Sequence, residues 1–144
     1  MNACKPSVLF VCVKNAGKSQ MAAGLMRKLA GDSVQVHSAG TRPGDALNPL
    51  SAESLAELGV DVSGEHPKPI EPDLLGRVDR VIVLGREAHI DAPEGVTVET
   101  WVTDEPSERG VDGIERMRLV RDEITRRVDR LYRDLMSQQP KRIS

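Results

Sequence analysis

The sequence is poor in cysteine and in aromatic side chains, and it has no long apolar run. Its two cysteines, Cys4 and Cys12, are too few for a disulfide framework or a multi-thiolate metal site. No stretch approaches the roughly 20 apolar residues of a membrane span, and residues 1–7 are too short and polar for a signal peptide. We therefore expect a cytoplasmic protein with no membrane partner.

Neither sign of charge dominates the chain. Its 20 Lys and Arg and 22 Asp and Glu give a net charge of −2, whereas a nucleic-acid partner would normally require a basic excess. The three histidines, His37, His66 and His89, lie in separate segments without the spacing of metal ligands. We expect no nucleic-acid partner, no metal site and no tightly bound cofactor.

The 144 residues suit one domain that spans 1–144. Short apolar, β-branched runs predict four buried strands, at 7–13, 34–39, 80–84 and 96–101. Apolar residues at helical spacing predict helices at 18–30, 48–58 and 114–136, with a short one near 73–76. Strands that alternate with helices predict an α/β fold of three layers, α/β/α, with a four-stranded parallel sheet.

The last predicted helix has the clearest pattern. Its apolar stripe is Met117, Val120, Ile124, Val128, Leu131 and Leu135. Three pairs of opposite charge are expected on its solvent side: Asp122/Arg126, Glu123/Arg127 and Asp129/Arg133. The polar loop before it, 102–113, is long for a small domain, which favours a functional role for that loop.

Cys12 stands where the first predicted strand ends, and it is followed by a turn and a helix start at Lys18. Unpaired N–H groups and the helix macrodipole make such a junction an anion site, and the same donors stabilise a thiolate. We predict that Cys12 is a thiolate nucleophile, aided by a hydrogen bond from Ser19 and the positive charge of Lys18. Asn15 tolerates the left-handed backbone that a tight cradle needs. The predicted oxyanion cradle is Val13, Lys14, Asn15, Ala16, Gly17, Lys18 and Ser19.

Two other interpretations of this segment are open. A free cysteine is often a buried core residue. Gly17-Lys18-Ser19 also matches the end of a nucleotide-binding phosphate loop. However, Cys12 occupies the position of that loop's first glycine, and Gly85 follows the strand at 80–84 in place of a magnesium-binding aspartate. The strand–turn–helix junction favours the thiolate interpretation.

Three motifs occur in the order of a known family. They are Cys12-Val-Lys-Asn-Ala-Gly-Lys-Ser19, Val36-His-Ser-Ala-Gly-Thr41 and Asp104-Glu-Pro106. With them, nearly the whole chain resembles the low-molecular-weight protein tyrosine phosphatases. Within that family it is most similar to the arsenate reductases, because Ser19-Gln-Met-Ala22 follows their pattern and Trp101 precedes the acid loop. That loop, 103–110, has no aromatic ring of the kind that holds phosphotyrosine.

The sequence departs from the family pattern at three places. Lys18 stands where the family has arginine, so a compact ammonium charge replaces a planar guanidinium group that can bind two oxygens at once. Ala23 stands where one branch has a potassium-binding glutamate. Segment 85–94 has none of the cysteines that resolve the oxidised nucleophile in the thioredoxin-coupled branch. Cys4 does not replace them, since it precedes the first strand and lies roughly 20 Å from Cys12.

The resemblance therefore implies the branch that uses an external thiol. In that branch Cys12 attacks arsenate, a small thiol such as mycothiol takes the arsenic, and mycoredoxin or a glutaredoxin-like protein completes the reduction to arsenite. This is the activity of an arsenate–mycothiol transferase. Two competing functions are a phosphotyrosine phosphatase and a non-catalytic oxyanion sensor.

The resemblance also implies a proton donor in the acid loop. Glu105 keeps the position directly before the proline, whereas Asp104 keeps the residue type, and we place Asp104 slightly ahead. Both side chains could instead be solvated carboxylates. We further expect the hydroxyl of Ser38 to brace Asn15, and Lys68 to supply the charge of the missing potassium ion.

Overall fold

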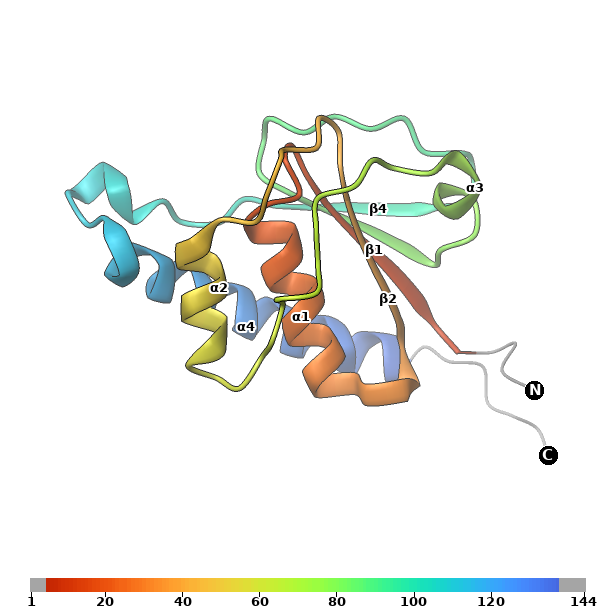
Figure 1. Ribbon diagram of the computed structural model, residues 1–144. Coiled ribbons are helices and arrows are strands. Elements are labelled where there is room, and N and C mark those ends of the chain that lie inside the picture. The colour runs from red at the N-terminus through yellow and green to blue at the C-terminus, as the bar shows by residue number, and fades with distance from the viewer. Residues whose placement is uncertain (1–4, 138–144) are drawn as a thin grey trace.

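The computed structural model describes residues 5–137, which are built around a parallel sheet. Its strands are β1 (Ser7–Cys12), β2 (Gln35–Gly40), β3 (Arg80–Leu84) and β4 (Thr97–Trp101). They lie in the order β2-β1-β3-β4, all parallel, so their carboxyl ends share one edge of the sheet (Figure 1). The predicted four-stranded parallel sheet is confirmed, and three of the four strands differ from their predicted bounds by one residue.

The helices are α1 (Lys18–Ala30), α2 (Pro49–Ala56), α3 (Pro72–Leu75) and α4 (Gly113–Ser137), with 3₁₀ turns at Gly31–Ser33 and Pro106–Arg109. α2 is shorter than the predicted 48–58 at both ends. Asn48 caps its start, because the side-chain oxygen of Asn48 accepts hydrogen bonds from the N–H groups of Leu50 and Ser51. After α2 the chain turns at Gly59, whose φ of 78° is outside the helical region.

Alternate strand residues face two separate cores, which produces the layers. On one face Phe10 and Ile82 pack in a core shared with α1, α2 and α4. On the other face Val11 and Val83 pack against Leu74 of α3 and neighbouring loops. Figure 1 shows the three longer helices grouped together and α3 apart from them. The predicted α/β/α layering is confirmed, with a second outer layer that consists of one short helix and loop segments.

Helix α4 buries the whole predicted stripe, from Met117 to Leu135. Two of the three predicted charge pairs on its solvent side are present, Glu123–Arg127 and Asp129–Arg133. The predicted pair Asp122–Arg126 is wrong, because Asp122 binds its neighbour Arg121 instead. Arg121 is buried, and a buried guanidinium needs a counter-charge more than an exposed one does.

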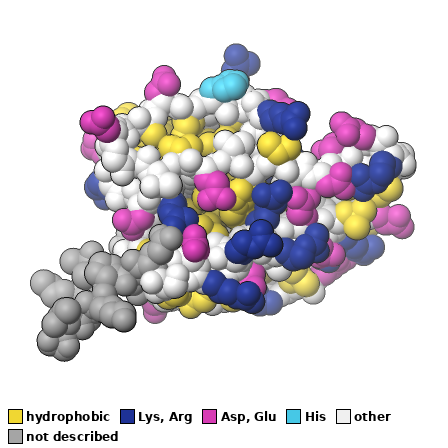
Figure 2. All heavy atoms as spheres, turned by 180° about the vertical axis from the view of Figure 1, so that it is seen from behind, with side chains coloured by type: hydrophobic (Ala, Val, Ile, Leu, Met, Phe, Trp, Pro, Cys, Tyr) yellow, Lys and Arg dark blue, Asp and Glu magenta, His cyan; other side chains and the backbone are white. Residues whose placement is uncertain are grey.

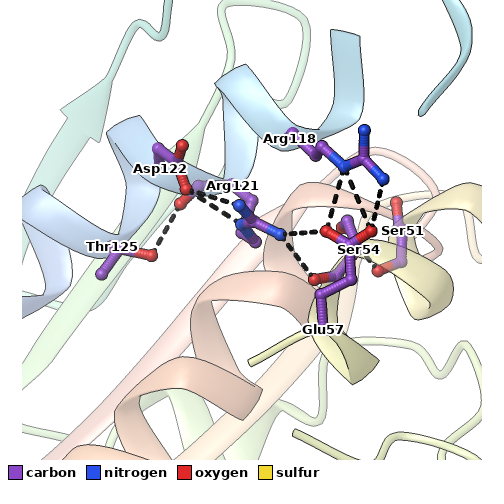
Figure 3. Close-up of polar contacts among 7 residues, drawn as sticks. All are labelled: Ser51, Ser54, Glu57, Arg118, Arg121, Asp122 and Thr125. Atoms are coloured by element: carbon purple, nitrogen blue, oxygen red, sulfur yellow. Dashed lines mark hydrogen bonds and ion pairs between the residues drawn. The ribbon is translucent and has the colours of Figure 1, made fainter. Parts of the chain in front are cut away.

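The same arginine joins α4 to α2 (Figure 3). Arg121 donates to the carbonyl oxygen of Ser54 at 2.9 Å and to the carboxylate of Glu57 at 2.8 Å. Arg118 binds that carboxylate as well, and hydrogen bonds from Arg118 and Arg121 lower the pKa of Glu57 to about 2. Because Glu57 directly follows α2, these contacts fix α2 and the segment in front of it.

Figure 2 shows charged side chains of both signs spread among hydrophobic and other residues on one face of the molecule. On the outer side of α4, the side chains of Arg126, Arg127 and Arg130 line a shallow hollow with those of Asp104, Leu119 and Glu123. No helix between residues 5 and 137 has the length and apolar character of a membrane span.

Candidate active site

Cys12 lies half-buried at the carboxyl end of β1, and its sulfur has two hydrogen-bond partners. The backbone N–H of Asn15 donates to Sγ at 3.2 Å, and Oγ of Ser19 lies 3.0 Å from Sγ. Met21 makes the first backbone bond of α1, to the carbonyl of Gly17, so the N–H groups of the preceding helical residues have no partner within the helix. The sulfur of Cys12 therefore lies beside a backbone donor and a hydroxyl group at the start of α1.

Asn15 holds the loop 12–19, the predicted catalytic loop, in shape. It is fully buried, and its φ of 53° is the one left-handed non-glycine conformation among residues 5–137, as the sequence predicts. Its side-chain nitrogen donates to Oγ of Ser19 at 2.7 Å, and its side-chain oxygen accepts from Gln20 and from the backbone N–H of Lys68. Because the hydroxyl oxygen of Ser19 accepts from Asn15, the hydroxyl proton of Ser19 is free to point at Cys12.

The segment 41–48 binds four carbonyl groups of the predicted catalytic loop. Thr41, Arg42, Gly44 and Asn48 donate their N–H groups to the carbonyls of Cys12, Val13, Lys14 and Ala16, at 3.1, 2.7, 2.9 and 2.8 Å. Carbonyl groups that are tied to this outer segment face away from the centre of the loop. An oxyanion cradle would use the N–H groups of the same loop, and that role stays a prediction.

The two loop lysines differ in exposure. Lys14 is exposed, whereas Lys18 is half-buried at the first position of α1. Neither side chain makes a hydrogen bond or ion pair with another residue of the described part of the chain. That Lys18 offers its charge to a bound anion stays a prediction.

The expected contact between Ser38 and Asn15 is absent from the described hydrogen bonds, and that prediction is wrong. The amide group of Asn15 is already occupied by Ser19, Gln20 and the backbone of Lys68. The hydroxyl of Ser38 instead accepts from the ammonium group of Lys68 at 3.2 Å.

The ammonium group of Lys68 also donates to the carbonyl of His66 at 3.2 Å and lies 3.8 Å from the carboxylate of Glu65. Burial lowers the pKa of Lys68, and Glu65 opposes that effect. A cation therefore lies beside the end of β2, where it ties the segment 65–68 to Ser38. That Lys68 takes the place of a metal ion stays a proposal.

Arginine side chains bind both candidate acids. Asp104 accepts two hydrogen bonds of 2.8 Å from Arg109, and hydrogen bonding to Arg109 is the main cause that lowers the pKa of Asp104. Glu105 is held by Arg116, whose hydrogen bonds are the main cause that lowers the pKa of Glu105 to about 2. Both groups are carboxylates near neutral pH in this arrangement. A proton donor would first have to leave its arginine, and the preference for Asp104 stays a prediction.

Other candidate centres are not supported by the described residues. Between residues 5 and 137, no group of three or more His, Cys, Asp and Glu side chains could hold a metal ion. Cys12 is a free thiol there. Cys4, predicted to be a bystander, lies outside the described residues. Trp101 is 3% exposed and packs against Phe10, with ring centroids 5.9 Å apart, so it is a core residue.

Comparison with known proteins agrees with this geometry. A family model described as low molecular weight phosphotyrosine protein phosphatase matches residues 7–141. The chain belongs to this family. An arsenate reductase of Bacillus licheniformis is 35% identical over 134 residues, which are 88% of this chain and 94% of that protein. The family resemblance predicted from three motifs is therefore confirmed.

The structure of this chain is similar to two solved structures of arsenate reductases. A thioredoxin-dependent arsenate reductase of Corynebacterium glutamicum matches with a TM-score of 0.79 and 36% identity, covering 93% of this chain. The match covers 63% of that protein, so this chain spans less than two thirds of its length. An arsenate reductase in the phosphate binding state matches with a TM-score of 0.78 and 30% identity, covering 90% of this chain and 98% of that one.

Two residues that lie against the loop after β1 are absent from the predicted site, and they are Gln20 and Gly40. Gln20 is buried, and its amide nitrogen lies 3.1 Å from the side-chain oxygen of Asn15 and 3.1 Å from the carbonyl of His66. A Cβ atom on Gly40 would lie 2.7 Å from the carbonyl oxygen of Val13. Both residues lie in the quoted motifs, Ser19-Gln-Met-Ala22 and Val36-His-Ser-Ala-Gly-Thr41, but the motifs assign them no structural role.

We expect the Glu105–Arg116 ion pair to make stability depend on pH. Because the pKa of Glu105 is lowered from 4.5 to about 2, the pair contributes fully above the ordinary value, and the contribution is lost as the pH falls toward about 2. Arg116→Gln is expected to lower the thermal unfolding midpoint at neutral pH. The difference from the wild type then shrinks between about pH 4.5 and pH 3.

A matched control is Arg133→Gln, which breaks a pair whose arginine side chain is 78% exposed. Exposed pairs contribute little, so this variant is expected to follow the wild type at every pH. A difference between Arg116→Gln and the wild type that stays constant down to pH 3 would contradict the prediction.

Proposed function

We propose that this protein is an arsenate reductase that works by thiol transfer. The observation that carries the proposal is the sulfur of Cys12, within hydrogen-bond distance of the N–H of Asn15 and the hydroxyl of Ser19 in an oxyanion-type loop. The arsenate reductases among its relatives support arsenate as the oxyanion. The ammonium group of Lys18 then offsets the negative charge of arsenate, but it cannot make the bidentate hydrogen bonds of an arginine.

The proposed reaction begins with attack of the Cys12 thiolate on arsenic. A sulfur–arsenic bond forms, an arsenic–oxygen bond breaks, and the oxygen leaves as water after it takes a proton. The thiolate of an external thiol next attacks the arsenic, which releases Cys12 unoxidised. A second thiol then attacks the sulfur of that adduct. The two thiols form a disulfide, and their two electrons reduce arsenic to arsenite.

Mycothiol is the proposed first thiol and a mycoredoxin or glutaredoxin-like protein supplies the second. The chain has two cysteines in all and none between 85 and 94, so it lacks a cysteine after β3 that could form a disulfide with Cys12. The Corynebacterium relative is described as thioredoxin-dependent, which makes thioredoxin the direct competitor. A free catalytic thiol also suits a reducing compartment, and we propose a cytoplasmic location.

Arsenite release in the presence of separate thiol systems tests the proposal. The full chain is supplied with arsenate and with mycothiol plus mycoredoxin, glutathione plus glutaredoxin, or thioredoxin with its reductase. We expect turnover with mycothiol and mycoredoxin, at least about tenfold above the thioredoxin arm, because no internal disulfide is available to thioredoxin. Arsenite release with the thioredoxin system alone would contradict the external-thiol mechanism.

The same assay separates the competing functions. Hydrolysis of p-nitrophenyl phosphate at a rate comparable with arsenite release would identify a phosphatase. Phosphate binding without arsenite release in any thiol system would identify an oxyanion sensor.

A further inference from the structure

Two buried side-chain polar atoms between residues 5 and 137 have no hydrogen-bond partner, and one is the hydroxyl oxygen of Thr103. Thr103 is 9% exposed. The other atom is the amide oxygen of Gln20, a residue already bonded to the catalytic loop. Buried hydroxyl groups nearly always have a partner, because an unsatisfied one disfavours the folded state. A buried hydroxyl without a partner in the protein therefore points to a partner that binds to it.

The sheet register places Thr103 close to Cys12. Val11 pairs with Val83, and Leu84 pairs with Trp101, so Cys12 and Trp101 end their strands at the same level. One strand separates them, which corresponds to a distance of roughly 10 Å between β1 and β4. Trp101 belongs to the core shared with α1 and α4, and the side chain of Cys12 packs against the same core.

Thr103 continues the inward face of β4. Trp101 and Thr103 are buried, whereas Val102 and Asp104 between and after them are exposed. From this alternation we infer that the side chain of Thr103 lies on the side of the sheet that Cys12 faces, two residues beyond the end of β4. The carboxylate of the next residue, Asp104, binds Arg109.

Helix α4 fixes this orientation from both sides of Thr103. Arg127 donates to the carbonyl of Val102 at 3.1 Å, and the carboxylate of Glu123 accepts from the N–H of Asp104 at 2.8 Å. With both neighbours anchored, the side chain of Thr103 stays on the inner face. A hydroxyl that is held in place and lacks a partner is preorganised to donate to a ligand oxygen.

We propose that the hydroxyl of Thr103 donates a hydrogen bond to the tetrahedral oxyanion bound above Cys12. The proposal rests on the proposed function, since it adds a substrate-contacting residue to the same site. In this role Thr103 supplies a neutral donor from the β4 side. The loop N–H groups and Lys18 supply donors and charge from the β1 side.

Titration with inorganic phosphate tests this role without any need for turnover. Calorimetry on the full chain compares the wild type with Thr103→Val, which keeps the side-chain shape and removes the hydroxyl. We expect Thr103→Val to bind phosphate about tenfold more weakly, because hydrogen bonds to charged groups are strong. Thr103→Ser restores the hydroxyl and is expected to bind within about threefold of the wild type.

Thermal unfolding without phosphate separates this role from a structural one. Thr103→Val is expected to unfold at the wild-type temperature or above, because the unpaired hydroxyl is gone. Thr100→Val, at an exposed position of β4, is the matched control and is expected to bind phosphate like the wild type. If Thr103→Val does not fold, Thr103→Ala and Thr103→Ser carry the comparison.

Unchanged phosphate affinity in Thr103→Val would overturn the proposal and would indicate a buried water as the partner of the hydroxyl. A wild-type chain that binds no phosphate would overturn it as well. Arsenite release by the wild type tests the proposed function separately. A chain that binds phosphate through Thr103 but releases no arsenite would refute the reductase while upholding this inference.

Discussion

Cys12→Ser is expected to lower arsenite release by on the order of 10⁴-fold or more, as the loss of a nucleophile does in other enzymes. A serine hydroxyl has nearly the same shape, so the contacts to Asn15 and Ser19 can persist, but it is far less ionised than a thiol. Phosphate binding is therefore expected to survive the substitution. Arsenite release and phosphate calorimetry on the same preparation measure the two properties.

Cys4→Ser is the matched control for Cys12→Ser, because it removes the second of the two cysteines. With external thiols present, we expect it to release arsenite within about twofold of the wild type, since Cys12 returns unoxidised in the proposed mechanism. A Cys4 variant as inactive as the Cys12 variant would show that an internal sulfur takes part. The external-thiol mechanism would then be wrong.

Gly40→Ala is expected to give the second largest loss. The added methyl group would lie 2.7 Å from the carbonyl oxygen of Val13 and 3.0 Å from the backbone nitrogen and Cβ of Asn15. Non-bonded atoms prefer roughly 3.5–4.0 Å, and two of these three are backbone atoms that cannot rotate away. The catalytic loop must therefore shift, and a misplacement on the order of 1 Å can cost about 100-fold in rate.

Overpacking of this kind is also expected to destabilise the fold by about 1–3 kcal/mol. Arsenite release and thermal unfolding measure the two effects. Gly64→Ala is the matched control, because a Cβ on Gly64 meets nothing within 4 Å. Gly40→Ala with the activity of Gly64→Ala would disprove the claim that the loop needs a glycine on β2.

The fold and the centre of the site could be predicted because both depend on short segments. Runs such as 80–84 predict buried strands from their own composition, and the observed β3 has those bounds. The loop after β1 also follows from local chemistry. Asn15 adopts the left-handed conformation that its side chain tolerates, and Ser19 reaches Cys12 across a single turn.

The hydrogen-bond and ion-pair partners of several side chains were decided by the tertiary structure alone. Ser38 binds Lys68 rather than Asn15, and Asp122 binds Arg121 rather than Arg126, because burial determines which donors lack a partner. The motif predicts where the acid loop lies. It does not predict that Arg109 and Arg116 bind the two carboxylates and lower their pKa values.

By itself, the sequence determined the parallel sheet and the shape of the loop after β1, since each is specified by residues within a few positions of one another. The close approach of Gly40 to Val13, the support from 41–48 and the inward face of Thr103 appeared only in three dimensions. These features depend on segments that are far apart in the sequence. Their geometry is set by the strand order and packing, which no local pattern of residues encodes.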